Sequence, residues 1–202
     1  MAASLAAHKV APNAISLSSI VFALGAGAAL GSTSLIGSPW TRLAWVLAAG
    51  LIQLRLLANM LDGMVAQVSG RSSPIGELYN ELPDRVSDSA ILIGAGYAIG
   101  GLPSLGYVAA IMALFVTYLR ATGAALGAGQ AFHGPMAKPH RMFVLTVACL
   151  FNGLAPIAWQ PLEARTGIGL IGIGLGVIIL GGVVTAYRRL RFVAVALRGT
   201  AA

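Results

Sequence analysis

The acidic residues of this chain are concentrated in one short stretch, which makes that stretch the first candidate for chemistry. Five of the six acids fall within residues 62–88: Asp62, Glu77, Glu81, Asp84 and Asp88. Oxygen ligands favour Mg²⁺, Mn²⁺ or Ca²⁺, and Mg²⁺ commonly shares its coordination shell with substrate phosphates. The stretch therefore predicts a divalent-cation site.

The spacing of these side chains fits two facing helices. Residues three and four apart share one face of a helix, so Asn59, Asp62 and Ala66 lie together. The same spacing recurs on the next helix, at Asn80, Asp84 and Asp88. Two antiparallel helices joined by a short loop would present these oxygens to one another.

A purely structural interpretation competes with this one. Carboxylates are stabilised near a helix N-terminus, so the acids can cap the helix that follows and pair with Arg71 and Arg85. This interpretation explains Glu77 and Glu81 better than it explains Asp62. We favour it for the two glutamates only.

The composition excludes an ordinary soluble domain. Of 202 residues, 13 are Lys or Arg and six are Asp or Glu, 57% are hydrophobic, and the mean hydropathy is +0.84. The net charge of +7 does not indicate nucleic-acid binding, because the basic residues stand singly between long apolar runs. Cys149 is the single cysteine, which excludes a disulfide framework and a thiolate metal cluster.

Six apolar runs are suitable for crossing a bilayer, at about 20 residues per crossing. They cover residues 15–36, 44–57, 89–102, 107–126, 142–159 and 168–187. We expect an all-α integral membrane protein whose six helices surround a polar cavity open to the cytoplasmic side. Residues 1–11 form either a short interfacial helix or a disordered start, residues 12–191 the membrane domain, and residues 192–202 a cytoplasmic tail.

The basic residues predict the orientation of these helices. Eleven of them fall at one side of the predicted bundle, and only Arg42 and Arg165 fall at the other. By the positive-inside rule, both termini and the acidic stretch are cytoplasmic, and Trp40 and Trp159 lie at the opposite interface. We expect a bacterial inner membrane as the location.

The second and third runs are too short to cross a bilayer, so their helices must extend into polar sequence. This extension brings Asp62, Asp84 and Asp88 to the headgroup level, where carboxylates are expected to face a cavity, a metal or a partner. Pro83 either kinks the third helix or lies harmlessly in its first turn. Glycines at 167, 169, 172, 174 and 176 predict close helix packing around the sixth run.

Three basic residues flank the connection between the fourth and fifth runs: Arg120, Lys138 and Arg141. A basic trio close to a metal site suits an acceptor that carries its own phosphate, because arginine can grip a phosphate through two hydrogen bonds. The alternative is the ordinary positive-inside signal. Arg188–Arg191 is interpreted as a headgroup-binding helix end.

The acidic stretch resembles the signature of the CDP-alcohol phosphatidyltransferases, D-x-x-D-G-x-x-A-R-x8-G-x-x-x-D-x-x-x-D. The sequence keeps its spacing, and the positions that match outright are Asp62, Gly63, Ala66, Gly76 and Asp84. Three positions differ: Asn59 and Asn80 replace aspartates, and Gln67 replaces the arginine.

Other segments carry the same resemblance. Residues 12–16 (PNAIS) resemble the family's entry to its first membrane helix, and six spans with both ends inside is the family's layout. Residues 118–121 (YLRA) and 136–141 (MAKPHR) resemble members that use phosphorylated acceptors.

The resemblance implies transfer of a substituted phosphate from a CDP-linked lipid, such as CDP-diacylglycerol, to an acceptor alcohol, with release of CMP in phospholipid biosynthesis. It implies Mg²⁺ or Mn²⁺, one or two ions, held by Asn59, Asp62, Asn80 and Asp84. Asp88 lies one turn beyond Asp84, and this spacing alone predicts it as a substitute ligand. The residues that it assigns to CDP are Asp62, Gly63, Ala66, Gln67 and Gly76. Asp84 occupies the position of the general base, and Arg120, Lys138 and Arg141 would hold an acceptor phosphate. Known relatives tend to be homodimers.

The departures leave alternatives open. Two Asp-to-Asn changes remove negative charge, so divalent-cation affinity should fall and a one-metal site becomes feasible. A catalytically weakened relative that binds CDP-lipid is one rival, and a small membrane transporter is another. The favoured acceptor is a phosphorylated polyol such as glycerol 3-phosphate or an inositol phosphate, while amino alcohols, sugar alcohols and other lipids stay open.

Overall fold

The computed structural model describes residues 12–68 and 74–199, with the side chains of residues 12, 13, 66, 67 and 74–80 left out. The long helices within these ranges are α2 (Pro12–Ser32), α3 (Trp40–Val68), α4 (Pro74–Tyr97), α5 (Pro103–Ala125), α6 (Lys138–Leu154) and α7 (Leu170–Gly199). A short 3-10 helix, η1 (Ile157–Trp159), lies between α6 and α7. The described part of the chain is therefore all-helical apart from one isolated β-bridge between Leu162 and Gly169.

Proline and glycine set several of the helix boundaries. Pro103 occupies the first turn of α5, where its missing N–H costs no intrahelical hydrogen bond. Gly100 has a φ of +75°, a conformation that favours glycine, and it ends the turn between α4 and α5. Pro83 lies inside α4, which begins at Pro74, so the interpretation that Pro83 belongs to the first turn is wrong.

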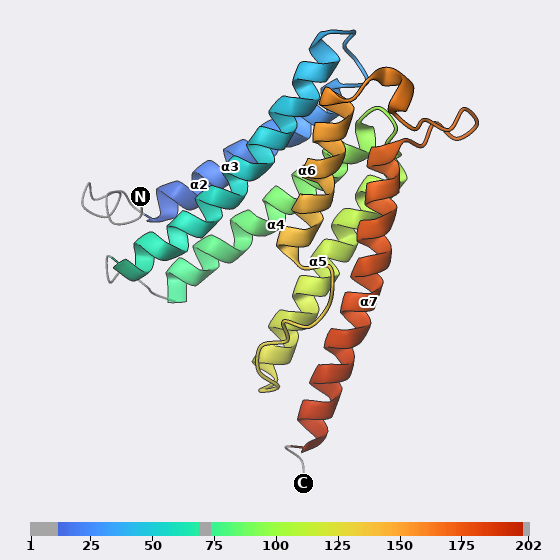
Figure 1. Ribbon diagram of the computed structural model, residues 1–202. Helices are drawn as coiled ribbons and strands as arrows, with labels where there is room; N and C mark the ends of the chain where they lie inside the picture. The colour runs from blue at the N-terminus through green and yellow to red at the C-terminus, as the bar shows by residue number, and fades with distance from the viewer. Residues whose placement is uncertain (1–11, 69–73, 200–202) are drawn as a thin grey trace.

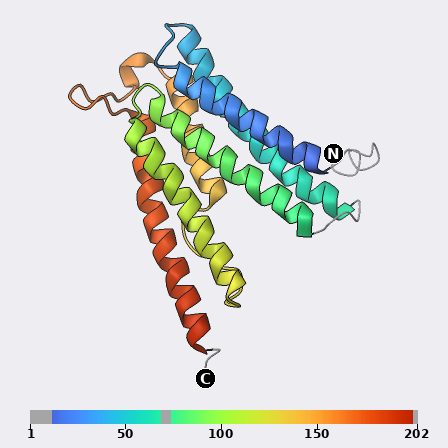
Figure 2. The ribbon, with the colours of Figure 1, turned by 180° about the vertical axis from the view of Figure 1, so that it is seen from behind.

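The helices form a bundle whose members separate toward one end (Figures 1 and 2). α2 packs against both α3 and α4, α4 packs against α5, and α5 packs against α7. α6 packs against α3 and α7, and lies between them in Figure 1. The chain therefore places the acidic ends of α3 and α4 opposite the start of α6 and the end of α5.

Glycines allow three close backbone approaches in the half of the bundle far from these acidic ends. A Cβ added at Gly94 of α4 would lie 2.4 Å from the carbonyl oxygen of Gly27 in α2. One added at Gly96 would lie 2.9 Å from Cα of Gly106 in α5. Near the start of α7, one added at Gly172 would lie 2.6 Å from the carbonyl oxygen of Gly100.

The glycine-packing prediction for the last helix is thus partly confirmed. A Cβ at Gly169 or Gly172 would meet the backbone of Gly100, and one at Gly174 would touch Val144. At positions 167 and 176 it would meet no atom within 4 Å, and position 167 lies in the preceding loop with a φ of +70°. Close packing therefore involves only part of the predicted set.

Four of the described helices are long and apolar enough to cross a membrane: Ala14–Ser32, Trp40–Val65, Pro103–Ala125 and Leu170–Arg198. α4 and α6 do not meet this criterion. α4 carries five charged residues, Glu77, Glu81, Asp84, Arg85 and Asp88, and α6 has only 17 residues. The six-span count therefore stays a prediction, whereas an all-helical membrane protein is supported.

Several predicted boundaries shift. The first helix ends at Ser32, because Thr33–Ile36 form turns, and the fifth ends at Leu154, before Pro156. α7 continues through residues 192–199, so these residues lengthen the last helix. The interfacial segment predicted for residues 1–11 lies outside the described residues.

Candidate active site

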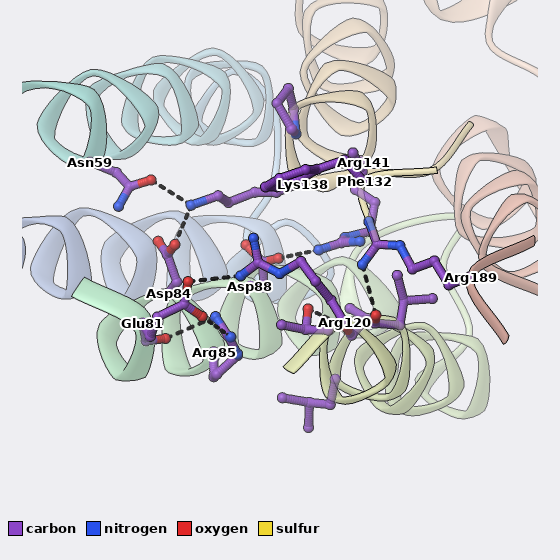
Figure 3. A pocket seen from close by; sticks show the side chains of 16 residues that line it. Asn59, Glu81, Asp84, Arg85, Asp88, Arg120, Phe132, Lys138, Arg141 and Arg189 are labelled. Carbon is purple, nitrogen blue, oxygen red and sulfur yellow. Dashed lines mark hydrogen bonds and ion pairs between the residues drawn. The ribbon is translucent and has the colours of Figure 1, made fainter. Parts of the chain in front are cut away.

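A charged cavity of about 290 Å³ lies where the ends of α3, α4, α5 and α6 meet (Figure 3). Its polar lining combines three acids, five bases, one amide and one hydroxyl: Glu81, Asp84, Asp88, Arg85, Arg120, Lys138, Arg141, Arg189, Asn59 and Thr117. Bases exceed acids on these walls, so the cavity suits an anionic ligand. An acidic side formed by α3 and α4 faces a basic side formed by α5, α6 and α7.

Lys138 links the two motif helices at the acidic side. Its ammonium group donates to Oδ1 of Asn59 on α3 and to Oδ2 of Asp84 on α4 (Figure 3). Lys138 is the first residue of α6, and its side chain is 27% exposed. The amide and carboxylate oxygens that the spacing predicts to face one another therefore do so, with a lysine cation between them.

Behind this contact lies a buried arginine. The side chain of Arg55, on α3, is 0% exposed, and its Nη2 donates to Oδ1 of Asp84 at 3.0 Å and Oδ1 of Asp88 at 2.8 Å. Nη2 of Arg141 donates to the second oxygen of Asp88, Oδ2, at 2.6 Å. Asp88 is thus bracketed by two guanidinium groups, which fix its position in the bundle.

Asp62 is held by a different set of contacts. Oγ of Ser16, on α2, donates to its Oδ2 at 2.6 Å, and the N–H of Gly63 donates to its Oδ1 at 2.6 Å. The carboxylate is buried and lies within electrostatic range of Asp84 and Lys138. A Cβ added at Gly63 would meet no atom within 4 Å, so helix packing does not explain this glycine.

The basic side of the cavity has its own pattern. Arg120 donates to Oε1 of Glu81 at 2.8 Å and lies 5.5 Å from the ring centre of Phe132, while Arg85 pairs with the other oxygen of Glu81. The pair with Arg85 is the one that the structural interpretation predicts for Glu81, whereas the capping part is wrong, because α4 begins at Pro74 and Glu81 lies beyond its first turn. The ion pairs therefore keep Arg120 at the cavity wall.

Arg189 of α7 is 5% exposed, and its hydrogen bonds to described residues go to backbone carbonyls. Its Nη1 bonds to the oxygen of Val116 at 2.8 Å and its Nε to the oxygen of His133 at 3.2 Å. Among the described residues it has no ion pair with a carboxylate. A buried cation at a cavity wall with neutral partners is suited to an anionic ligand.

The sixth acid, Glu163, stabilises a loop at the other end of the bundle. Glu163 accepts hydrogen bonds from Thr166 and from the backbone N–H of Arg165. The side-chain hydrogen bond from Thr166, followed by those from the backbone, lowers the pKa of Glu163 below its ordinary value. This carboxylate is therefore explained by loop structure alone.

The donor set fits a hard divalent cation of the Mg²⁺ or Mn²⁺ type. Asp62, Asp84 and Asn59 supply oxygen atoms, which such ions prefer. Within residues 12–68 and 74–199, no three His, Cys, Asp or Glu side chains form a metal-binding group. A bound ion would therefore complete its coordination with water, amide or phosphate oxygens, as Mg²⁺ commonly does.

The structure brings most of the predicted site residues together. Those described at or beside the cavity are Asn59, Asp62, Gly63, Asp84, Asp88, Arg120, Lys138 and Arg141. The side chains of Ala66, Gln67 and Asn80, and the surroundings of Gly76, are outside the described part of the chain. Their assigned roles stay predictions.

Sequence reasoning missed two arginines and a serine. Arg55 lies four residues before Asn59, so helical spacing places it on the motif face. Arg189 follows Gly182 and Thr185 at spacings of three and four, and all three are buried. Both signals were available in the sequence, but charge alone suggested exposed helix ends. Ser16 is the last residue of the PNAIS segment, so its signal was the resemblance of that segment to the family's first helix entry.

The fold and the site together define a helical membrane protein with a cavity suited to phosphate-bearing ligands. The chain belongs to the CDP-alcohol phosphatidyltransferase family, whose model matches residues 9–187. This match confirms the resemblance seen in the motif, and it includes the three positions that differ from the signature.

Curated relatives agree with this assignment. An archaetidylinositol phosphate synthase of Aeropyrum pernix is 36% identical over 107 residues, which are 52% of this chain and 54% of the relative. A phosphatidylinositol phosphate synthase of Streptomyces avermitilis is 29% identical over 145 residues, covering 69% of this chain and 57% of the relative. The chain thus spans a little over half the length of these relatives.

Solved structures share the fold. Phosphatidylinositol phosphate synthase of Mycobacterium tuberculosis, in complex with manganese and citrate, superposes with a TM-score of 0.77 at 18% identity. The match covers 96% of this chain and 87% of that one. The same enzyme with CDP-DAG bound gives a TM-score of 0.75 at 19% identity, covering 95% and 90%. At these identities the comparison establishes the fold.

Proposed function

We propose that this protein transfers a phosphatidyl-type group from a CDP-linked lipid, such as CDP-diacylglycerol, to a phosphorylated polyol and releases CMP. The observation that carries the proposal is the two-sided cavity. Asp84 and Asn59 face Lys138 on one wall, and Arg120, Arg141 and Arg189 line the opposite wall. A donor pyrophosphate needs cations beside oxygen ligands, and an acceptor phosphate needs arginines, within one cavity.

An inositol phosphate is the acceptor that we favour. The curated relatives in Aeropyrum and Streptomyces are named as inositol phosphate lipid synthases, and family membership supports the general reaction. The buried cation of Arg189, whose contacts are carbonyl oxygens, supports an acceptor that brings its own negative charge. This residue joins Arg120, Lys138 and Arg141 in the proposed phosphate site.

The proposed donor site uses the acidic side. Asp62 and Asn59, with Asn80 and Asp84 as further members of the set, would hold Mg²⁺ or Mn²⁺, and a solved relative contains manganese. Asp88, predicted as a substitute ligand, is left out because both of its oxygens accept from arginines. Such an ion neutralises charge on the pyrophosphate during transfer. The open space beside Gly63 leaves room for the nucleotide, and we assign Ala66, Gln67 and Gly76 to the same CDP site.

Asp84 is proposed to act as the general base. Its Oδ1 is fixed by Arg55, and its Oδ2 faces Lys138 at the cavity. The acceptor hydroxyl attacks the phosphorus that bears the lipid, the bond from that phosphorus to the CMP oxygen breaks, and Oδ2 takes the hydroxyl proton. For this step the flexible side chain of Lys138 must leave Oδ2 and follow the incoming phosphates.

We also propose that six helices cross a bacterial inner membrane with both termini and the cavity in the cytoplasm. The distribution of basic residues supports this orientation, as do the exposed indoles of Trp40 and Trp159 at the end of the bundle opposite the cavity. Residues 12–191 would form the membrane domain between the segments 1–11 and 192–202. A homodimer stays a prediction.

The test is CMP release by the purified full chain in detergent. CDP-diacylglycerol is supplied with Mg²⁺ or Mn²⁺ and with inositol 1-phosphate, glycerol 3-phosphate, free inositol or no acceptor. We expect CMP release with a phosphorylated polyol and a loss of at least about 100-fold in Asp84→Asn, in line with removal of a general base. Glu163→Gln, which changes an acid remote from the cavity, is the matched control and should keep its rate.

The alternatives give different results. CDP-lipid binding without CMP release under any condition would contradict the proposal and favour a catalytically weakened relative. Release of CMP with free inositol but not with inositol 1-phosphate would overturn the assignment of the phosphate site. Flux of a solute through proteoliposomes, without CMP formation, would instead support a transporter.

A further inference from the structure

Arg55 is the most deeply buried charge in the described part of the bundle. Its side chain is 0% exposed, and it does not line the cavity. Only Nη2 has partners among the described residues, whereas Nε and Nη1 are buried without one. A buried arginine in a membrane bundle is costly unless it is compensated, and among the side chains that the structure describes Asp84 and Asp88 compensate this one.

The carboxylate oxygens of α4 can be accounted for one by one. Oδ1 of Asp84 and Oδ1 of Asp88 accept from Arg55, Oδ2 of Asp88 accepts from Arg141, and Oδ2 of Asp84 accepts from Lys138. Three of the four oxygens therefore face buried guanidinium groups.

The basic side chains that donate to these oxygens differ in how freely they can move. The side chains of Arg55 and Arg141 are 0% and 5% exposed, whereas that of Lys138 is 27% exposed. Lys138 stands on a flexible stem at the cavity wall and can be displaced by an incoming ligand. Arg55 is enclosed by packed helices, and Arg141 lines the cavity with its Nη2 bonded to Asp88, so we expect three oxygens to stay occupied when the cavity fills.

We propose that Arg55 is a positioning residue that acts as a fixed internal cation and restricts the acidic cluster to a single divalent ion. Arg55 retains Oδ1 of Asp84 and Oδ1 of Asp88, and Arg141 retains Oδ2 of Asp88, so these two aspartates offer the cavity only Oδ2 of Asp84. A second ion cannot bridge the two aspartates through this one oxygen. The single ion binds at the Asp62 and Asn59 side. This inference rests on the divalent-cation site of the proposed function.

The first test counts bound Mn²⁺ on the full chain, purified in detergent and saturated with CDP. Calorimetry gives the stoichiometry, and electron paramagnetic resonance distinguishes an isolated ion from a spin-coupled pair. We expect one Mn²⁺ per chain with the six-line spectrum of an isolated ion. A spin-coupled pair in the wild type would overturn the inference.

The second test changes the internal cation. Arg55→Met removes the charge and frees two carboxylate oxygens, so we expect the stoichiometry to rise from one to two Mn²⁺ per chain and spin coupling to appear. Arg55→Lys keeps the charge and is the matched control, with one isolated ion expected. One ion in a folded Arg55→Met chain, or two ions in Arg55→Lys, would contradict the role.

A third variant keeps the inference testable if Arg55→Met does not yield a monodisperse protein. The double change Arg55→Met/Asp88→Asn removes one charge of each sign, so the net charge of the buried cluster is unchanged, and the amide oxygen introduced at position 88 can still accept from Arg141. We expect Mn²⁺ to bind about tenfold more tightly than in the wild type, because Asp84 can then offer both oxygens. Unchanged Mn²⁺ affinity would overturn the inference.

The same samples separate this inference from the proposed function. A chain that binds one isolated Mn²⁺ and releases no CMP with any acceptor would contradict the function and leave the role of Arg55 intact. A chain that releases CMP while holding a spin-coupled Mn²⁺ pair would support the proposed function and contradict the role of Arg55.

Discussion

Replacing Arg189 by glutamine tests the basic side of the cavity most directly. The guanidinium is 5% exposed, lines the cavity, and among the described contacts bonds only to the carbonyl oxygens of Val116 and His133. If an acceptor phosphate binds here, Arg189→Gln removes a charge-assisted hydrogen bond worth about 1.5–3 kcal/mol. At 1.4 kcal/mol per factor of ten, acceptor affinity should fall roughly 10- to 150-fold.

Stability should change much less than acceptor affinity. Losing one of the two bonds to backbone carbonyls costs about 0.5–1.5 kcal/mol, and glutamine can replace the other. Removing a buried cation that has no carboxylate partner offsets part of this cost. The substitution also removes the electrostatic repulsion that Arg120 and Arg141 exert on Arg189 within the cavity, which offsets a further part of the cost. We therefore expect the melting temperature in detergent to change by only a few degrees.

The assay is the rate of CMP release with inositol 1-phosphate varied at saturating CDP-diacylglycerol, and then with the donor varied. The KM for the acceptor should rise by the factor above, while the KM for the donor should stay within about twofold. Arg188→Gln is the matched control, because its exposed side chain lies outside the cavity. An equal effect of both variants, or a loss confined to the donor KM, would refute the reasoning.

Three further outcomes follow from contacts elsewhere in the bundle. Gly94→Val should lower stability by about 1–3 kcal/mol, since its Cβ would lie 2.4 Å from the α2 backbone, whereas Gly50→Ala, with no atom within 4 Å, should be nearly neutral in thermal unfolding. Ser16→Ala should weaken Mn²⁺ binding roughly 10-fold in calorimetry, because it removes the hydrogen bond that orients Asp62; unchanged affinity would contradict that role. Asn59→Asp should strengthen Mn²⁺ binding about tenfold by adding charge beside the site, and weaker binding would contradict its assignment as a ligand.

The faces of the motif helices were predictable because they follow from local geometry. Spacings of three and four residues placed Asn59 with Asp62 and Asp84 with Asp88, and the structure has these pairs on facing helices. The same rule applied to Arg55 would have placed it on the motif face. The charge pattern counts Arg55 only as one of the eleven basic residues on the predicted cytoplasmic side, because hydropathy alone does not distinguish a buried arginine from an exposed one.

The position of Lys138 could not be derived in this way. It depends on the loop between α5 and α6, which is tied to α7 by the bond from Arg189 to the oxygen of His133 and by the N–H of Met136 donating to Thr185 at 2.9 Å. These contacts join segments about 50 residues apart in the chain. Such long-range pairing is set by packing of the whole bundle, and no local pattern in the sequence encodes it.

The glycine contacts of α4 divide the bundle into two mechanically different halves. Where Gly27 meets Gly94 and Gly100 meets Gly169, backbones touch without intervening side chains, so these points resist both compression and sliding. At the other end the helices are separated by long charged side chains, including Lys138, which can change rotamer. If the helices move apart to admit a lipid-tailed donor, they should pivot about the end where the glycines touch. The displacement should be largest at the end that carries the ion pairs.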